Sequence, residues 1–220
     1  MSDFNPSYTG LRTDLLKFIK GEDLKVLDVG CASGVNGKYL LDQNMANVVY
    51  GIEYDEIMAQ EAAKWNTKTF IGDLNLRIFR EEILRSTNNF DFIIFGDILE
   101  HLYSPVEVLT ELKNCMADEG KIIISLPNIA HIELFIQVFI KGRWPRNNRG
   151  IFDRTHLRWF TKKDAEAMIK DAGLKVIHYK PTLRARDAIG SSFDWKTKLI
   201  RWVNKDWVTF QHIFVCEHDH

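Results

Sequence analysis

The chain has 220 residues, of which 45% are apolar and 27% are charged, and its formal net charge is −1. This length suits one domain with a substantial core, and the near-neutral charge argues against a nucleic-acid partner. Neither residues 1–10 nor the apolar stretch 129–140 has the composition of a signal peptide or the length of a membrane span, so we expect no membrane insertion. The three widely spaced cysteines form no zinc or disulfide motif, so we expect a cytoplasmic protein without a metal site.

Short apolar strands alternate with helical patterns along the first 127 residues. A first helix is predicted over about 8–20, and a short strand is predicted just before Asp73. The other predicted strands are 25–30, 47–53, 90–96 and 121–127, and the helices between them lie near 34–43, 55–65, 76–86 and 105–116. This alternation predicts a doubly wound α/β fold on a mostly parallel sheet.

The pattern changes after residue 127. The later predicted elements are, in order, an apolar helix over about 128–141, a basic and aromatic turn-rich segment, a helix capped by Thr161 and closed by Gly173, and strands near 174–180 and 207–216. The two late strands are expected to form an antiparallel C-terminal edge of the sheet. We therefore expect one domain over 1–220, with a lid and acceptor-binding segment at about 128–160 and an insertion at about 182–206.

A glycine-rich turn follows the first strand. The stretch VLDVGCASG, residues 26–34, has Gly30 at the start of the turn and Gly34 at its end, which permits a close backbone approach to a ligand. In a doubly wound fold, ligands bind beyond the carboxyl ends of the strands, near the free N–H groups of the next helix. Glu53 ends the second strand, and a carboxylate there can accept both hydroxyls of a ribose. These features predict a ligand that contains a nucleoside.

The same turn argues against a pyrophosphate. The second and third glycines of a G-x-G-x-x-G motif are replaced by Ala32 and Val35. Asp73, after the short third strand, and Asp97, after the fourth, add carboxylates at the same edge of the sheet. Carboxylates suit an adenosyl ligand without phosphate, so a nucleotide-dependent oxidoreductase is the less favoured alternative.

Taken in order, the motifs VLDVGCASG, GIEYD, GDL and FDFIIFGDILEHL resemble those of class I S-adenosylmethionine (SAM)-dependent methyltransferases, over about residues 24–180. The DILEH form resembles the branch that includes ubiquinone-biosynthesis O-methyltransferases. The stretches LPNIAHIELFIQVFIKGRW and GIFDRTHLRWFT resemble bacterial methyltransferases associated with glycosyltransferases, and also the methionine-biosynthesis protein W group. The resemblance implies a seven-stranded, Rossmann-like sheet. Ala32 departs from the glycine common in the family and is expected to reshape the turn slightly.

The resemblance implies SAM as cofactor and S-adenosylhomocysteine as product. Asp28, Gly30, Gly34 and the backbone at Ala32 would hold the methionine end, and Glu53 would hold the ribose. Tyr54 would flank the adenine, Asp73 and Leu74 would contact its edge, and Asp97 would face the amino-acid portion.

The sulfonium methyl group is already activated, so catalysis is chiefly in-line positioning in a site that excludes water. A hydroxyl acceptor must also lose its proton. His101 is the first candidate base, because it follows the fourth strand on the cofactor side, and Glu100 is a candidate to orient it. His131 and His156 come next, because both lie in the segment expected to cover the site.

Two later segments bear on the acceptor and on partners. Residues 141–158 carry six basic side chains against Asp153, with aromatic residues interleaved. This pattern indicates an anionic small-molecule acceptor, a solvated loop or a single-stranded nucleic-acid groove, and the near-neutral net charge argues against the last. Phe193, Leu199, Trp202 and Val203 form a partly amphipathic stripe that would cover the site or pair two subunits as a homodimer. The favoured function is O-methylation of a small polar, sugar-linked or anionic metabolite, and the alternative is a regulatory SAM-binding partner of a biosynthetic enzyme.

Overall fold

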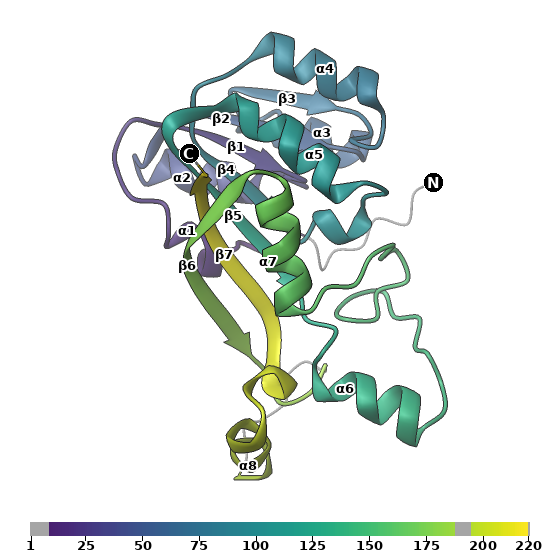
Figure 1. The fold of residues 1–220 in the computed structure, drawn as a ribbon. Helices are drawn as coiled ribbons and strands as arrows, with labels where there is room; N and C mark the ends of the chain where they lie inside the picture. The colour runs from purple at the N-terminus through teal and green to yellow at the C-terminus, as the bar shows by residue number, and fades with distance from the viewer. Residues whose placement is uncertain (1–8, 188–194, 220) are drawn as a thin grey trace.

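A computed structural model describes residues 9–187 and 195–219 and shows a seven-stranded sheet in the order β3-β2-β1-β4-β5-β7-β6 (Figure 1). The strands are β1 Leu24–Val29, β2 Ala46–Glu53, β3 Lys68–Ile71, β4 Phe90–Gly96, β5 Met116–Pro127, β6 Leu174–Leu183 and β7 Thr209–His218. β1 to β5 pair in parallel, and β7 lies antiparallel between β5 and β6. The predicted fold is confirmed. Of the two antiparallel C-terminal strands, β6 is the outermost strand of the sheet and β7 lies between it and β5.

Helices cover both faces of this sheet. The α-helices are α1 Thr13–Leu16, α2 Val35–Asp42, α3 Glu56–Ala62, α4 Arg77–Ser86, α5 Pro105–Leu112, α6 Ile132–Leu134, α7 Lys162–Asp171 and α8 Trp195–Val203. Side chains of α4, α5 and α7 share one apolar cluster with Ile93 and Phe95 of β4. Those of α1 and α2 share the opposite cluster with Phe92 and Ile94 of the same strand. A strand that is buried on both faces reads as a continuous apolar run, as β4 does.

Two predicted helices differ from the structure. The first helix is only α1, one turn long, rather than 8–20. The helix expected over 128–141 begins later than predicted. It consists of the short α6, Ile132–Leu134, followed directly by a π-helix over Phe135–Ile140. Asn128 is held instead by the main chain at the start of β7 and just before it, since its side-chain amide donates to the carbonyl oxygens of Asp206 and Thr209 at 2.9 and 2.7 Å. Those contacts join residues far apart in sequence, and an apolar pattern does not reveal them.

The predicted insertion at 182–206 contains residues 188–194, so Phe193 lies outside the described residues. The described part of this segment contains the last residues of β6 and the whole of α8. Both α8 and α6 lie in the lower part of Figure 1. Leu199, Trp202 and Val203 of α8 are exposed. Within residues 9–187 and 195–219, no helix is long and apolar enough to cross a membrane.

Candidate active site

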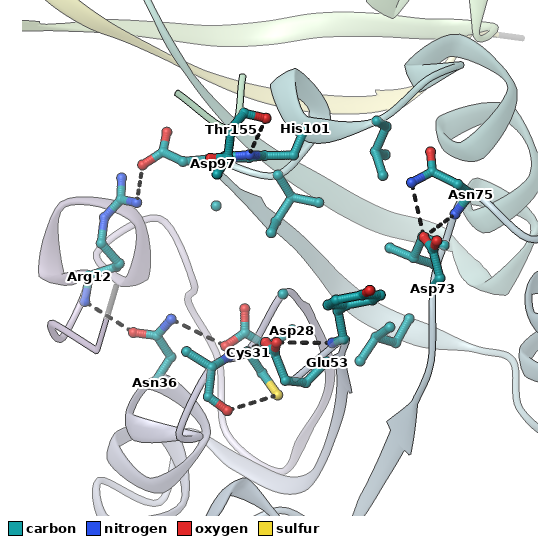
Figure 2. Close-up of a pocket in the computed structure, with 18 of the residues that line it drawn as sticks. Arg12, Asp28, Cys31, Asn36, Glu53, Asp73, Asn75, Asp97, His101 and Thr155 are labelled. Carbon is teal, nitrogen blue, oxygen red and sulfur yellow. Dashed lines mark hydrogen bonds and ion pairs between the residues drawn. The ribbon is translucent and has the colours of Figure 1, made fainter. Parts of the chain in front are cut away.

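A cavity of about 640 Å³ opens at the carboxyl ends of β1, β2, β3 and β4 (Figure 2). Nine of the thirteen predicted site residues line it: Asp28, Gly30, Ala32, Glu53, Tyr54, Asp73, Leu74, Asp97 and His101. Gly34, Glu100, His131 and His156 do not line it. The carboxyl ends of neighbouring parallel strands meet at one edge of the sheet, which is why residues far apart in sequence share this cavity.

The glycine-rich turn is fastened to the end of β2. The N–H groups of Gly30 and Cys31 donate to the carbonyl oxygen of Ile52 at 2.8 and 3.0 Å. The Glu53 carboxylate accepts from the Ala32 N–H at 2.8 Å through one oxygen, and from the N–H groups of Tyr54 and Asp55 through the other. Glu53 therefore fixes the turn and also faces the cavity.

Ala32 adopts a left-handed backbone conformation, with φ of 46°. Such a conformation costs a residue with a Cβ about 1–2 kcal/mol, whereas glycine adopts it freely at an entropic cost of about 0.5–1 kcal/mol. Ala32→Gly is therefore expected to raise the free energy of unfolding slightly, by about 0.5 kcal/mol, as measured by urea denaturation. A loss above about 1 kcal/mol would show instead that packing of the Ala32 methyl group outweighs the backbone strain.

Asp28 is a buried carboxyl group at the floor of the cavity. The side-chain amide of Asn36 donates to its Oδ2 at 3.2 Å, and Asn36 in turn accepts from the Arg12 backbone N–H at 3.0 Å (Figure 2). Burial raises the pKa of Asp28 to about 7, against the opposing effects of Asn36 and Arg12. A cationic group in the cavity would therefore bring Asp28 fully to its charged form.

Asp73 closes the cavity on the β3 side. Its Oδ1 accepts from the backbone and side-chain N–H groups of Asn75 at 2.8 and 2.9 Å. The side-chain oxygen of Asn75 in turn accepts from the Tyr103 backbone N–H at 2.8 Å. Asn75 and Tyr103 also line the cavity, although the sequence analysis did not identify them. They join the turn after β3 to the segment before α5.

Asp97 is the centre of a network that no motif in the sequence reveals. Arg12 donates to its Oδ2 at 2.5 Å, Gln211 donates to both oxygens at 2.6 and 2.7 Å, and the Ser125 hydroxyl donates to Oδ1 at 2.8 Å. Asp97 also has a positive φ of 59°. These three partners come from before α1, from β7 and from β5, and no sequence signal links them to position 97.

The catalytic candidates after β4 form a compact cluster. His101 lines the cavity, and its Nδ1 lies 3.3 Å from the carbonyl oxygen of Thr155. Behind it, Glu100 is buried, and its Oε1 lies 3.9 Å from Nε2 of the buried His156. The His101 and His156 rings contact edge to face, with centroids 4.8 Å apart. The structure therefore brings three of the four candidates together.

Burial favours the uncharged form of each group in this cluster. It raises the pKa of Glu100, with a smaller contribution from Asp97. It lowers the pKa of His101, and it lowers that of His156 to about 4, helped there by repulsion from His101. A neutral imidazole has a free lone pair, so His101 can bind a proton or a cation at neutral pH.

His131 lies outside the cavity, contrary to the expectation that it covers the site. Its Nε2 lies 2.8 Å from the carbonyl oxygen of Arg184, its Nδ1 accepts from the Glu133 N–H, and its ring contacts Phe210. His131 therefore caps α6 and packs below the end of the sheet. Of the predicted lid at 128–160, only Thr155 and Leu157 line the cavity.

Glu133, beside His131, is buried and forms an ion pair with the partly exposed Arg186. Arg186 donates to its two oxygens at 2.6 and 3.0 Å, and Gln137 donates to Oε1 at 2.6 Å. Burial alone would raise the pKa of Glu133, but Arg186 and Gln137 outweigh it and lower the pKa to about 2. A lowered pKa stabilises the fold above the unfolded-state pKa, and this stabilisation is lost as the pH falls through about 2.

Glu133→Gln is expected to lower the free energy of unfolding by about 1–3 kcal/mol at pH 7. The difference from the unaltered protein should shrink steadily as the pH falls from about 5 to 3, in urea titrations at each pH. Glu217→Gln is the control, because Glu217 pairs with Lys175 on the surface and such pairs contribute less than about 1 kcal/mol. A pH-independent loss in Glu133→Gln would contradict the assigned pKa.

The basic stretch 141–158 lies largely at the surface. None of its six basic residues lines the cavity, and the arginines among them are exposed. Trp144 contacts the rings of Phe152 and Trp159. Asp153 accepts from the backbone N–H and the side-chain hydroxyl of Thr155, which fixes the turn. The turn serves to place Thr155 and His156 near His101.

A sheet in this order, with β7 reversed and a carboxylate-lined cavity at the ends of β1 to β4, defines the class of Rossmann-like methyltransferases. The chain matches the model of the methyltransferase domain family over residues 7–179, and it belongs to that family. It is a SAM-dependent methyltransferase, and neither the oxidoreductase nor the regulatory-partner alternative is favoured.

Three proteins illustrate the similarity. The ubiquinone biosynthesis O-methyltransferase of Glaesserella parasuis serovar 5 is 25% identical over 199 residues, which are 83% of this chain and 74% of that protein. A SAM-dependent methyltransferase from Archaeoglobus fulgidus has a TM-score of 0.61 at 18% identity, covering 91% of this chain and 88% of that one. The magnesium protoporphyrin IX methyltransferase of Synechocystis PCC 6803, solved with bound S-adenosylhomocysteine, has a TM-score of 0.58 at 16% identity, covering 89% and 74%. The two solved structures support the fold.

Proposed function

We propose that this methyltransferase transfers the methyl group to a hydroxyl oxygen of a small polar metabolite, sugar-linked or anionic, in the cytoplasm. The observation that carries the proposal is the histidine at the cavity wall. His101 lines the cavity within the same strand-end segment as Asp97, and the buried Glu100 and His156 lie behind it. Unlike an amine or a thiolate, a neutral hydroxyl needs help to lose its proton, and this cluster is built to assist that loss. The similarity to an O-methyltransferase supports the same reaction.

The cavity offers a complementary partner for each part of SAM. Asp28, with its raised pKa, would gain a full charge opposite the ammonium of the methionine end. Glu53 would accept the ribose hydroxyls, and Asp97 would face the amino-acid portion. The turn formed by Gly30, Ala32 and Gly34 would bring its backbone close to the ligand, and Tyr54, Asp73 and Leu74 would surround the adenine.

Methyl transfer from a sulfonium needs little bond activation by the protein. The reacting oxygen must approach in line with the carbon–sulfur bond, and the enzyme gains rate by holding both partners in that geometry away from water. The carbon–oxygen bond forms as the carbon–sulfur bond breaks, and its electron pair stays on sulfur. The hydroxyl proton must leave during the same step, which is the task assigned to the cluster around His101.

Calorimetry with SAM and with NAD, followed by an assay of S-adenosylhomocysteine release, tests this function. We expect SAM to bind and NAD not to bind. We expect release with hydroxylated acceptors that carry a carboxylate, phosphate or sugar, and none with matched amines or thiols. Release confined to amine or thiol acceptors would overturn O-methylation but would leave SAM dependence intact.

Glu53→Ala is expected to weaken SAM binding by about 1–3 kcal/mol, roughly 5- to 150-fold, because bonded groups lose their partners. In the variant, the ribose hydroxyls would lack their acceptor, and the Ala32 N–H would lose the hydrogen bond that it donates to Glu53. Isothermal titration calorimetry measures it directly. Glu56→Ala, an exposed carboxylate at the start of α3, is the control and should bind SAM normally. Equal affinities for the two variants would contradict the assignment of Glu53.

A further inference from the structure

Glu100 is a buried carboxyl group with an incomplete set of partners. Its side chain is 1% exposed, and Oε2 has no hydrogen-bond partner among the described residues. Its other oxygen, Oε1, lies 3.9 Å from His156 Nε2, which is beyond hydrogen-bond distance. A buried polar atom without a partner costs roughly 1–3 kcal/mol. A group that bound this oxygen would remove that cost.

Three side chains of types that commonly bind metal ions lie together at this point. One ligand atom from each of Glu100, His101 and His156 lies within 4.8 Å of the other two. Metal bonds of about 2.0–2.2 Å bring ligand atoms somewhat closer than this, so small side-chain rotations suffice to close the site. Two imidazoles and one carboxylate suit Zn²⁺ and similar transition metals better than Mg²⁺, which prefers oxygen ligands. Three protein ligands also leave a coordination position open.

The backbone holds His156 beside Glu100 and His101, although His156 lies far from them in sequence. The N–H groups of Leu157 and Arg158 both donate to the carbonyl oxygen of Glu100, at 2.9 and 3.0 Å. This pair of bonds places the turn that carries His156 directly against the segment that carries Glu100 and His101. Asp153 stiffens the turn by accepting from the N–H and hydroxyl of Thr155 at 2.9 and 2.7 Å.

The tautomer of His101 also suits a metal ligand. Its Nδ1 lies 3.3 Å from the carbonyl oxygen of Thr155, and Figure 2 shows the two residues side by side next to Asp97. A carbonyl oxygen only accepts, so Nδ1 carries the proton and Nε2 keeps its lone pair. Metal-binding histidines characteristically donate their other ring N–H to a carbonyl or carboxylate in this way.

The charges around the cluster favour a cation. The carboxylates of Asp97 and Asp153 act electrostatically on Glu100, and Arg12 opposes them. Arg12 is itself bonded to Asp97 and Asp14, so two carboxylates share its charge. Asp97 and Asp153 therefore bring negative charge toward the cluster, and Arg12 offsets part of it.

We propose that Glu100, His101 and His156 bind one divalent transition-metal ion beside the acceptor end of the cavity, with a position left open for the acceptor hydroxyl. The inference rests on the proposed O-methylation and gives it a mechanism. Coordination lowers the pKa of a bound hydroxyl, so its proton passes to solvent and the oxygen becomes the nucleophile. The methyl carbon then bonds to that oxygen and leaves the sulfonium sulfur with its electron pair. The products are the methyl ether, S-adenosylhomocysteine and one proton.

Metal binding is measured on the full chain without a polyhistidine tag, after dialysis against a chelator. We expect Zn²⁺ to bind with one-to-one stoichiometry in calorimetry, and Co²⁺ to give the visible absorption of an ion with nitrogen and oxygen ligands. His156→Gln and Glu100→Gln should each weaken Zn²⁺ binding at least 100-fold. His178→Gln, which alters an exposed histidine of β6, is the matched control and should bind Zn²⁺ normally.

SAM binding and thermal unfolding report whether each variant is folded, because neither His156 nor Glu100 lines the cavity. A protein that binds SAM but binds no Zn²⁺ overturns the inference, as does Zn²⁺ binding that is equal in His156→Gln, Glu100→Gln and His178→Gln. Hydroxyl methylation by the metal-free protein at an unchanged rate overturns it and leaves the proposed function standing. Zn²⁺ binding lost in both variants supports the site, even if no hydroxyl acceptor is methylated and O-methylation itself fails.

Discussion

His101→Asn is expected to lower kcat by about 10²- to 10⁴-fold, the range that proton-transfer assistance contributes. The imidazole is the candidate catalytic group that lines the cavity, and it is the link between the acceptor and the buried pair behind it. Asparagine keeps a side-chain N–H for the carbonyl oxygen of Thr155, so the fold of the turn should survive. Steady-state release of S-adenosylhomocysteine gives kcat, and calorimetry gives the SAM affinity, which should stay within about threefold.

This result separates His101 from Glu53, because Glu53→Ala should change affinity and His101→Asn should change turnover. His178→Asn is the control for a histidine outside the site. If His101→Asn lost SAM binding while kcat per bound enzyme stayed constant, His101 would belong to the cofactor site rather than to the acceptor side.

Gly34→Ala is expected to lower the free energy of unfolding by about 2–4 kcal/mol. Gly34 precedes α2 with a φ of 77°, a left-handed conformation that costs a residue with a Cβ about 1–2 kcal/mol. An added Cβ would also lie 2.8 Å from the Cα of Ala62, so the backbone of α3 would have to move. Overpacking of this kind typically costs a further 1–3 kcal/mol.

Gly142→Ala isolates the first of these two costs. Gly142 has a φ of 61°, but apart from its chain neighbours no atom of residues 9–187 and 195–219 lies within 4 Å of its added Cβ. Urea denaturation should therefore show a loss of about 1–2 kcal/mol for Gly142→Ala and a clearly larger one for Gly34→Ala. Equal losses would show that α3 yields to the added methyl group without cost.

The half of the site near β1 to β3 was predictable from sequence because its residues lie beside the strand ends that position them. Asp28, Glu53 and Asp73 each end or follow an apolar run, and a parallel sheet brings such ends together. The neighbourhood of Asp97 was not predictable, since its partners Arg12 and Gln211 come from the two ends of the chain.

The acceptor side was only partly predictable for the same reason. DILEH marked Glu100 and His101, but their meeting with His156 depends on backbone bonds from Leu157 and Arg158 to Glu100. His131 was expected at the site because it lies in the segment predicted to cover it, yet its bond to Arg184 holds it elsewhere. The expectation of no metal site came from cysteine spacing, which carries no information about a glutamate and two histidines joined by a turn.

The position of β7 has a consequence for synthesis of the chain. β6 joins the sheet through β7, and β7 also carries Gln211 to Asp97. A nascent chain that has emerged only through β6 therefore has neither an edge for that strand nor a complete Asp97 network. The sheet can therefore be completed only after β7 has emerged from the ribosome and has inserted between β5 and β6. Since a domain generally folds as a unit, we expect the enzyme to become competent at that point and not earlier.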